Sequence, residues 1–142
     1  AEGLPPLVTE AGPAERQFGV YPARFGNIYT PRQLLQLFQR AYGLFEPAQE
    51  AWHDAQGRVL DPFRPRVEPG GFASLDALAE DRTRHLAAVR RMFEECDALI
   101  LTLGLTEGWR AAADGAAWPL PPDAAGAVDA AEARFHNATV VE

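Results

Sequence analysis

Apolar residues recur at helical spacing in the segment that follows Thr30. Leucine and aromatic side chains stand three or four positions apart between residues 34 and 42, which places them on one face of a helix. Thr30 and Gln33 match the sequence of a capping box, Pro31 occupies the first helical position, and Gly43 follows the last apolar residue. The pattern therefore predicts a helix that begins after Thr30 and stops at Gly43.

A longer apolar stripe with the same period follows Ser74. Apolar residues recur from Leu75 to Phe93, while most arginines of this segment fall on the other side. Ser74 is a favoured residue for a helix N-cap, so we predict a helix from Ser74 to about Glu95. His85 lies on the apolar side of this helix, which favours a hydrogen-bonded core histidine over a role in supporting a site.

Three further segments have the pattern of extended chain. Residues 52–62 predict a β-hairpin with turn residues at its centre, and we expect it to be an excursion on the surface. Residues 98–103 form an apolar run that ends in Gly104, typical of a strand buried on both faces. Residues 135–140 predict a strand or extended arm. A long helix followed by a buried strand indicates an α/β fold, in which the loop 104–109 would lie where such sheets bind ligands.

The composition fits one globular domain. The chain has 142 residues, 47% of them hydrophobic, and a domain usually has about 100–200 residues. The formal net charge is −7 and every basic residue is an arginine, so the acidic balance argues against binding to nucleic acid or to an anionic membrane. No segment has the pattern of a membrane span or a signal peptide, which predicts a cytoplasmic protein.

Two glycine-containing segments carry residues suited to stabilising an oxyanion. Gly26 and Asn27 precede the first predicted helix, where backbone N–H groups and a carboxamide can donate to an anion; on spacing alone, shaping a turn is the simpler explanation. Glu107 follows Gly104 and Thr106 in the predicted ligand-binding loop. Its carboxylate is a candidate base, and the alternative is a solvated loop residue.

The sequence contains no complete catalytic triad and no metal site. Ser74 is the only serine and stands at a helix cap, so the parts of a Ser/His/Asp triad are incomplete. Cys96 is the only cysteine, and its acidic neighbours Glu95 and Asp97 favour a buried structural thiol over a reactive thiolate. The three histidines fit no metal-ligand spacing. We therefore expect neither a metal nor a cofactor.

Several blocks of the chain resemble, in order and spacing, the GSCFA family, bacterial proteins named for a Gly-Ser-Cys-Phe-Ala motif near the start of their domain. A series of blocks is more specific than any single motif. They span nearly the whole chain and are LVTE (7–10), RFGNIYTPRQLLQLF (24–38), DPFRP (61–65), PGGFAS (69–74), DRTRHLAAVRRMFE (81–94), LTLGLTEGW (101–109) and FHNATV (135–140).

The resemblance implies a branch of the SGNH/GDSL hydrolases and hence part of a flavodoxin-like three-layer α/β/α sandwich. In that superfamily a serine attacks an ester, a glycine and an asparagine on later loops donate to the oxyanion, and a late histidine with an aspartate activates the serine. By this resemblance Gly26 and Asn27 match the second block of the site. Gly104, Thr106 and Glu107 match the third, with Thr106 in place of the asparagine. Both segments are then expected to meet at one end of the sheet.

The resemblance also implies that parts of the domain are missing. The Gly-Ser-Cys-Phe-Ala block expected before Leu7 and the blocks expected beyond Glu142 are not in the chain, so we interpret residues 1–142 as the central portion of a single domain. The leading hypothesis is an ester hydrolase acting on a small-molecule or acylated carbohydrate ester, to which this chain supplies the oxyanion side while being inactive alone.

Two alternatives to catalysis stay open. One is a noncatalytic domain of the same fold that binds a ligand or a partner through Thr106 and Glu107, and the other is a truncated product without activity. Under every one of these hypotheses, the missing strands of the domain would leave the edges of a strand at residues 98–103 exposed, which favours self-association.

Overall fold

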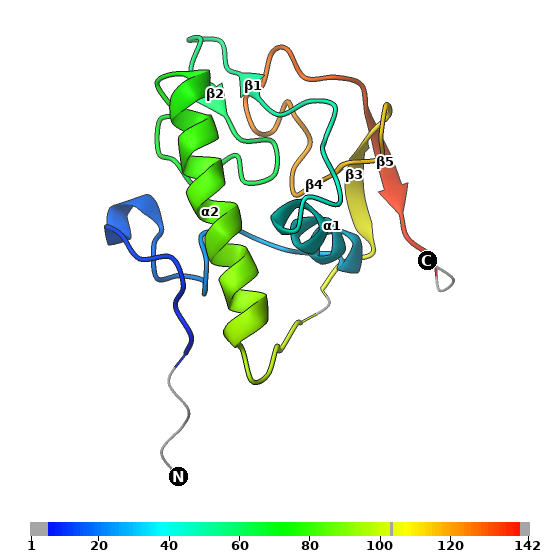
Figure 1. Ribbon diagram of the computed structural model, residues 1–142. Helices are drawn as coiled ribbons and strands as arrows, with labels where there is room; N and C mark the ends of the chain where they lie inside the picture. The colour runs from blue at the N-terminus through cyan, green and yellow to red at the C-terminus, as the bar shows by residue number, and fades with distance from the viewer. Residues whose placement is uncertain (1–5, 103, 140–142) are drawn as a thin grey trace.

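The computed structural model describes residues 6–102 and 104–139, which combine helices with two small antiparallel sheets (Figure 1). This part of the chain is therefore mixed α/β. In chain order its elements are a short 3-10 helix η1 (Ala14–Arg16), α1 (Pro31–Ala41), β1 (Trp52–His53), β2 (Val59–Leu60), α2 (Leu75–Glu95), β3 (Glu107–Ala111), β4 (Ala117–Trp118) and β5 (Ala133–Asn137).

The predicted cap of α1 is confirmed. The Thr30 hydroxyl accepts a hydrogen bond from the Gln33 backbone N–H at 3.3 Å, and the Gln33 side-chain oxygen accepts one from the Thr30 N–H at 3.0 Å. Pro31 is the first helical residue. Leu37 of this helix belongs to a buried apolar cluster with Ala88, Val89 and Met92 of α2, so packing of the two helices forms one core of the molecule.

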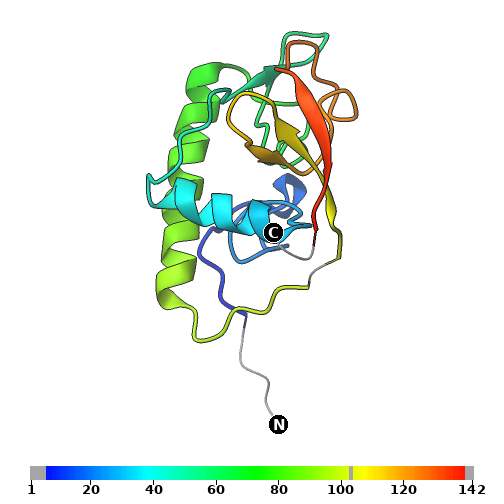
Figure 2. The same cartoon turned by 90° about the vertical axis from the view of Figure 1, so that its right-hand side faces the viewer.

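The second predicted helix is also confirmed. The Ser74 hydroxyl accepts from the Ala77 N–H at 3.1 Å, and α2 ends at Glu95. It runs along one side of the molecule, with α1 between it and the three-stranded sheet (Figures 1 and 2). Cys96 follows as the C-cap and is half-buried. No helix in the described part of the chain is long and apolar enough to cross a membrane.

The predicted hairpin exists but is not a surface excursion. β1 and β2 pair in antiparallel register, with Trp52 opposite Leu60, yet Trp52 is fully buried. Its indole meets that of Trp118 edge to face, with ring centroids 4.8 Å apart. Such aromatic burial removes a large apolar area from water. The hairpin therefore packs against the three-stranded sheet, and the two together form a second core.

The second sheet has the order β4-β3-β5, with all strands antiparallel. Its central strand β3 begins at Glu107, where the sequence predicts a loop. The prediction of a strand or extended arm at residues 135–140 is confirmed by β5, which ends at Asn137. Val140 lies outside the described residues. Within residues 6–102 and 104–139 every strand pair is antiparallel, so the layered parallel sheet implied by the resemblance is not seen there.

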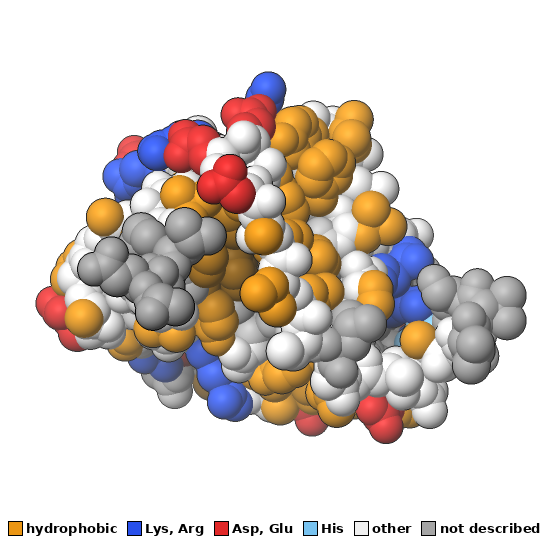
Figure 3. Space-filling view, turned by 90° about the horizontal axis from the view of Figure 1, so that it is seen from below, with side chains coloured by type: hydrophobic (Ala, Val, Ile, Leu, Met, Phe, Trp, Pro, Cys, Tyr) orange, Lys and Arg blue, Asp and Glu red, His pale blue; other side chains and the backbone are white. Residues whose placement is uncertain are grey.

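The prediction of a buried strand at residues 98–103 is wrong for residues 98–102, the part of this segment that the structure describes. Residues 98–102 form no strand, and Leu103 lies outside the described residues. Leu99 and Ile100 are 49% and 89% exposed. Figure 3 views this side of the molecule and shows apolar side chains gathered across the middle of the face. A strand needs a neighbour for its backbone hydrogen bonds, and none of the described strands pairs with this run.

This exposed run leads us to expect self-association of the chain. Exposed apolar residues that also favour extended structure recruit a second copy, which covers them and removes apolar area from water at roughly 25 cal/mol per Å². In sedimentation experiments the average mass of the wild type should rise with concentration. The variant Ile100→Asp should shift the association to higher concentration, because it places a charge in the contact.

The matched control for this experiment is Val128→Asp, which adds the same charge at a residue that is 67% exposed in a different loop. It should associate as the wild type does. A wild type that stays monomeric across the concentration series, with one sharp and concentration-independent thermal transition, would contradict the expectation.

A network of buried charges ties α2 to the segments beside it. Asp81 of α2 accepts hydrogen bonds from two arginines, Arg24 at 2.6 Å and Arg64 at 2.5 Å. Arg64 also donates to Asp61 at 2.9 Å, and Arg24 to Glu68 at 3.3 Å. Burial by itself raises the pKa of Asp61, but the positive charges of Arg64 and of neighbouring arginines outweigh it and hold this pKa far below its usual range.

His85 is a hydrogen-bonded core histidine, as predicted. It is 1% exposed, and its Nδ1 lies 2.8 Å from a carboxylate oxygen of Glu10. Burial, together with the charge of Arg64, lowers the pKa of His85 to about 4 despite the nearby Glu10 carboxylate. This histidine is therefore neutral near pH 7, and its hydrogen bond fastens the N-terminal segment to α2.

Candidate functional site

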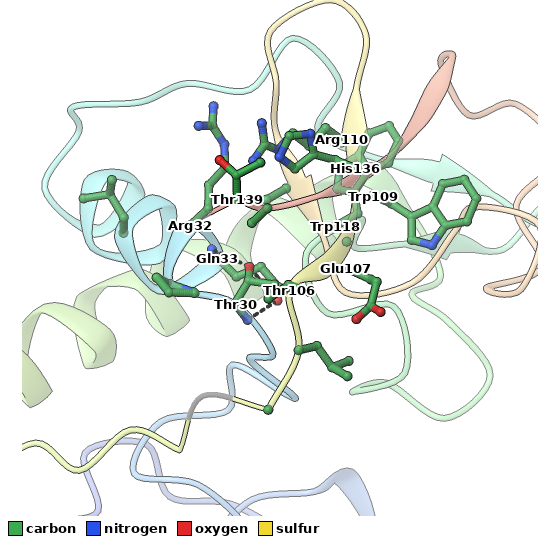
Figure 4. Close-up of a pocket in the computed structure, with 17 residues that line it drawn as sticks. Thr30, Arg32, Gln33, Thr106, Glu107, Trp109, Arg110, Trp118, His136 and Thr139 are labelled. Atoms are coloured by element: carbon green, nitrogen blue, oxygen red, sulfur yellow. Dashed lines mark hydrogen bonds between the residues drawn. The ribbon is translucent and has the colours of Figure 1, made fainter. Parts of the chain in front are cut away.

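The largest cavity described, of about 660 Å³, lies between the start of α1 and the three-stranded sheet (Figure 4). Small-molecule sites usually have a volume of about 300–1,000 Å³. The lining comes from the first turn of α1, from residues 104–106, and from all three strands of the sheet with the segment after β5. This cavity is therefore the candidate functional site of the chain.

The start of β3 lies directly against the cap of α1. A Cβ atom added at Gly108 would stand 3.8 Å from the Thr30 methyl carbon. The other end of the sheet is fastened to the same helix, because Gln36 donates to the Gly115 carbonyl at 3.0 Å and accepts from the Ala117 N–H at 2.6 Å. These contacts hold helix and sheet together on two sides of the cavity.

Two arginines and a histidine gather on one side of the cavity. Side chains alternate between the two faces of a strand, so Gly108 and Arg110 of β3 share a face with His136, the residue opposite Gly108 on β5. Arg32 extends toward the same region from the first turn of α1. Figure 4 shows Arg32, Arg110, His136 and Thr139 together there.

The predicted loop residues Gly104, Thr106 and Glu107 all line this cavity. The Thr106 carbonyl accepts from the Ala138 N–H at 2.8 Å, which fixes the approach to β3. Glu107 is exposed, and its carboxylate points away from the arginines (Figure 4). Its position therefore suits a residue at the rim of the cavity rather than a partner of the positive side chains.

Gly26 and Asn27 line a different and smaller pocket, of about 80 Å³. Gly26 is buried and adopts a φ of +74°, a left-handed conformation that glycine adopts without strain. The Asn27 side chain accepts from the Tyr21 hydroxyl and donates to the Tyr29 hydroxyl at 2.9 Å. The structure therefore brings the three predicted loop residues to one cavity and places Gly26 and Asn27 at another.

Arg32, Arg110 and His136 also line the cavity, although the sequence singled out none of them as a site residue. Arg110 could have been found if residues 107–111 had been recognised as a strand, because its face then follows from the alternation of side chains. Arg32 is visible in sequence only as a residue of the helix start.

The described residues that line the cavity include no serine and no cysteine. Ser74 caps α2 at 3.1 Å from the Ala77 nitrogen and does not line this cavity. Within residues 6–102 and 104–139, no three His, Cys, Asp or Glu side chains come together as a metal site. What the described lining offers is hydrogen-bond donors and positive charge, which suit the binding of a negatively charged or carbonyl oxygen.

The model of the GSCFA family matches residues 13–140 of the chain. No curated protein and no solved structure matches it.

Proposed function

The chain belongs to the GSCFA family, and from this membership and the geometry of the cavity we propose that it supplies the oxyanion and binding side of an ester-hydrolase site. The observation that carries the proposal is that Gly104, Thr106 and Glu107 line one cavity of about 660 Å³ together with positive side chains. The hydrolase activity follows from the resemblance to the SGNH/GDSL enzymes, and the cavity supports it by offering donors where an ester would bind.

In the proposed reaction a nucleophile forms a bond to the ester carbonyl carbon, and the carbonyl oxygen takes the negative charge. The oxygen would lie near Thr106, whose hydroxyl is the donor in place of the superfamily's asparagine. Arg32 and Arg110 add positive charge on the same cavity wall. The intermediate then collapses, the alcohol leaves with a proton, and water releases the acid from the nucleophile.

The nucleophile is proposed to come from residues other than those that line the cavity in the described structure, because these include no serine or cysteine. The three-layer sandwich of the superfamily belongs to the same proposal.

The test compares the isolated chain of 142 residues with the complete product of its gene, using short p-nitrophenyl esters. The isolated chain should show no turnover, because donors without a nucleophile lack the covalent step. The complete product should turn over, and Thr106→Val should lower its kcat by about 100-fold or more, the usual cost of losing one oxyanion donor.

Thr83→Val is the matched control for this variant, because Thr83 is exposed on α2 and donates only to the carbonyl one helical turn before it. It should leave kcat unchanged. A complete product that is inert, or one whose kcat is insensitive to Thr106→Val, would contradict the proposal, and so would turnover by the isolated chain that Glu107→Gln abolishes.

A noncatalytic binding domain is the second candidate. It is favoured by the same absence of serine and cysteine from the described lining, together with the concentration of positive side chains there. In that case the complete gene product would bind a ligand in this cavity with the wild-type residues and release it unchanged. Product analysis after prolonged incubation distinguishes this candidate from hydrolysis.

A further inference from the structure

Arg40 carries a buried positive charge that has no ionic partner among residues 6–102 and 104–139. It lies in the last turn of α1 and is 7% exposed. Its Nη2 atom is buried and makes no hydrogen bond. Burial lowers the pKa of Arg40 to about 10, so the side chain is still charged near pH 7. A charge removed from water without a hydrogen-bonded partner is costly, which indicates that something else balances it.

The groups beside Arg40 do not supply that partner. The nearby Asp61 carboxylate favours the charged form of Arg40 from a distance, but its oxygens accept from Arg64 at 2.9 Å and from the Phe63 N–H at 3.0 Å. The Arg40 guanidinium lies over the Phe63 ring, with its carbon 3.6 Å from the ring centroid. An aromatic face attracts a cation, but it leaves the donor Nη2 without an acceptor.

A small cavity of about 20 Å³ adjoins Arg40. A cavity of about 10–15 Å³ is enough for an occupant of the size of a water molecule, so this one holds a single small species and has no room for a carboxylate or phosphate group. Its lining is mostly apolar, and the only polar side chains among the described lining residues are Asn27, Gln33 and Arg40.

These polar side chains offer donors rather than acceptors. The Gln33 side-chain oxygen already accepts from the backbone N–H groups of Tyr29 and Thr30, at 2.9 and 3.0 Å, which leaves its NH₂ group to donate. The Asn27 oxygen is engaged by the Tyr21 hydroxyl, and the Asn27 NH₂ group donates to Tyr29. A water molecule would need acceptors for its own hydrogens, whereas an anion needs only donors.

We propose that this cavity is a binding site for a monatomic anion, chloride, held by the guanidinium of Arg40 and the side-chain amide of Gln33. The anion neutralises the buried charge and accepts from the unpaired Nη2 atom. It also joins α1 to the other segments that line the cavity, among them residues 25–28 and β4. This role is separate from the proposed hydrolase function and needs no nucleophile.

The experiment is urea denaturation of the chain at fixed protein concentration, with sodium chloride replaced stepwise by sodium gluconate at constant ionic strength. Gluconate is too large for the cavity. Two or three charge-assisted hydrogen bonds correspond to a Kd of about 1 mM. The ratio of folded to unfolded chain should therefore be about 100-fold higher in 100 mM chloride than in gluconate. Bromide should act as chloride does, and sulfate should act as gluconate does.

The variant Arg40→Met removes the guanidinium and keeps an unbranched apolar side chain, so its stability should be the same in chloride and in gluconate. Arg84→Met is the matched control, because Arg84 is an exposed arginine of α2; it should keep the full response to chloride. A measurement that needs no variant is a crystal of the wild type grown in bromide, which should show an anomalous peak within hydrogen-bond distance of the Arg40 guanidinium.

Equal stability of the wild type in chloride and in gluconate would overturn this inference, and so would a response to chloride that Arg40→Met retains. A bromide crystal without an anomalous peak in the cavity would also overturn it and would indicate that a water molecule fills the space. None of these results bears on hydrolysis, which is tested by turnover of esters, so the two proposals fail independently.

Discussion

Replacing Asp81 with alanine is expected to lower the free energy of unfolding by about 3–5 kcal/mol. Asp81 is the shared acceptor of Arg24 and Arg64, whose side chains are each 1% exposed. Without the carboxylate, both guanidinium groups lose an ionic partner in surroundings from which water is excluded. Since a domain is stable by only about 5–15 kcal/mol, this single change should bring the protein close to unfolding.

The measurement is equilibrium denaturation in urea, with Glu94→Ala as the matched control. Glu94 is an acidic residue of the same helix that pairs with Arg90 at 2.8 Å, but both side chains are about half exposed, and such exposed pairs contribute at most about 0.5 kcal/mol. If the alanine variant of Asp81 does not fold, Asp81→Asn keeps the shape of the side chain. A loss no larger than that of the control for both Asp81 variants would show that the network is not needed for stability.

The second large effect is a loss of stability in weak acid that depends on His85. The pKa of His85 is lowered by burial to about 4, below its ordinary value of 6.5. Between these two pH values the unfolded chain binds a proton that the folded chain does not. The free energy of unfolding should therefore fall as the pH drops from 6.5 to 4, by about 3 kcal/mol from this group.

The test follows urea denaturation of the wild type and of His85→Gln at several pH values between 4 and 8. Glutamine can still donate a hydrogen bond to Glu10 but does not titrate, so the variant should lose stability less steeply below pH 6.5. Burial alone would raise the pKa of Glu10, but its hydrogen bond with His85 and its contacts with Arg24 and Arg64 outweigh burial and lower this pKa below 4.5. Protonation of Glu10 therefore adds a further loss of stability as the pH falls below 4.5. Parallel pH profiles of the two proteins would rule out His85 as the source.

The resemblance predicts that two groups of site residues meet, but the structure places them at different pockets. The loop residues Gly104, Thr106 and Glu107 line the large cavity, while Asn27 is engaged by two tyrosine hydroxyls at a smaller pocket. Their roles in catalysis stay predictions. Thr106→Val tests the first group directly through kcat.

The sequence by itself determined the elements that local interactions stabilise. The caps of α1 and α2 depend on side chains within three residues of the helix start, and the apolar period identifies the buried face of each helix, so both helices could be predicted with their ends. The hairpin at β1 and β2 is also local, because its turn residues lie between its strands. The hydrogen-bonded state of His85 followed from its place on the apolar face of α2.

Only the tertiary structure decided which extended segments pair and which charges are buried. The apolar run 98–102 has the composition of a strand but finds no partner among the described strands, whereas residues 107–111, with a glycine and an arginine, are hydrogen-bonded on both sides. The pairing of Asp81 with Arg24 joins residues 57 positions apart. Arg32 and Arg110 reach one cavity from a helix and a strand that are likewise distant in the chain. Strand pairing, ion pairing and cavity formation all require partners that are remote in sequence, and a pattern of neighbouring residues carries no information about which remote partner is chosen.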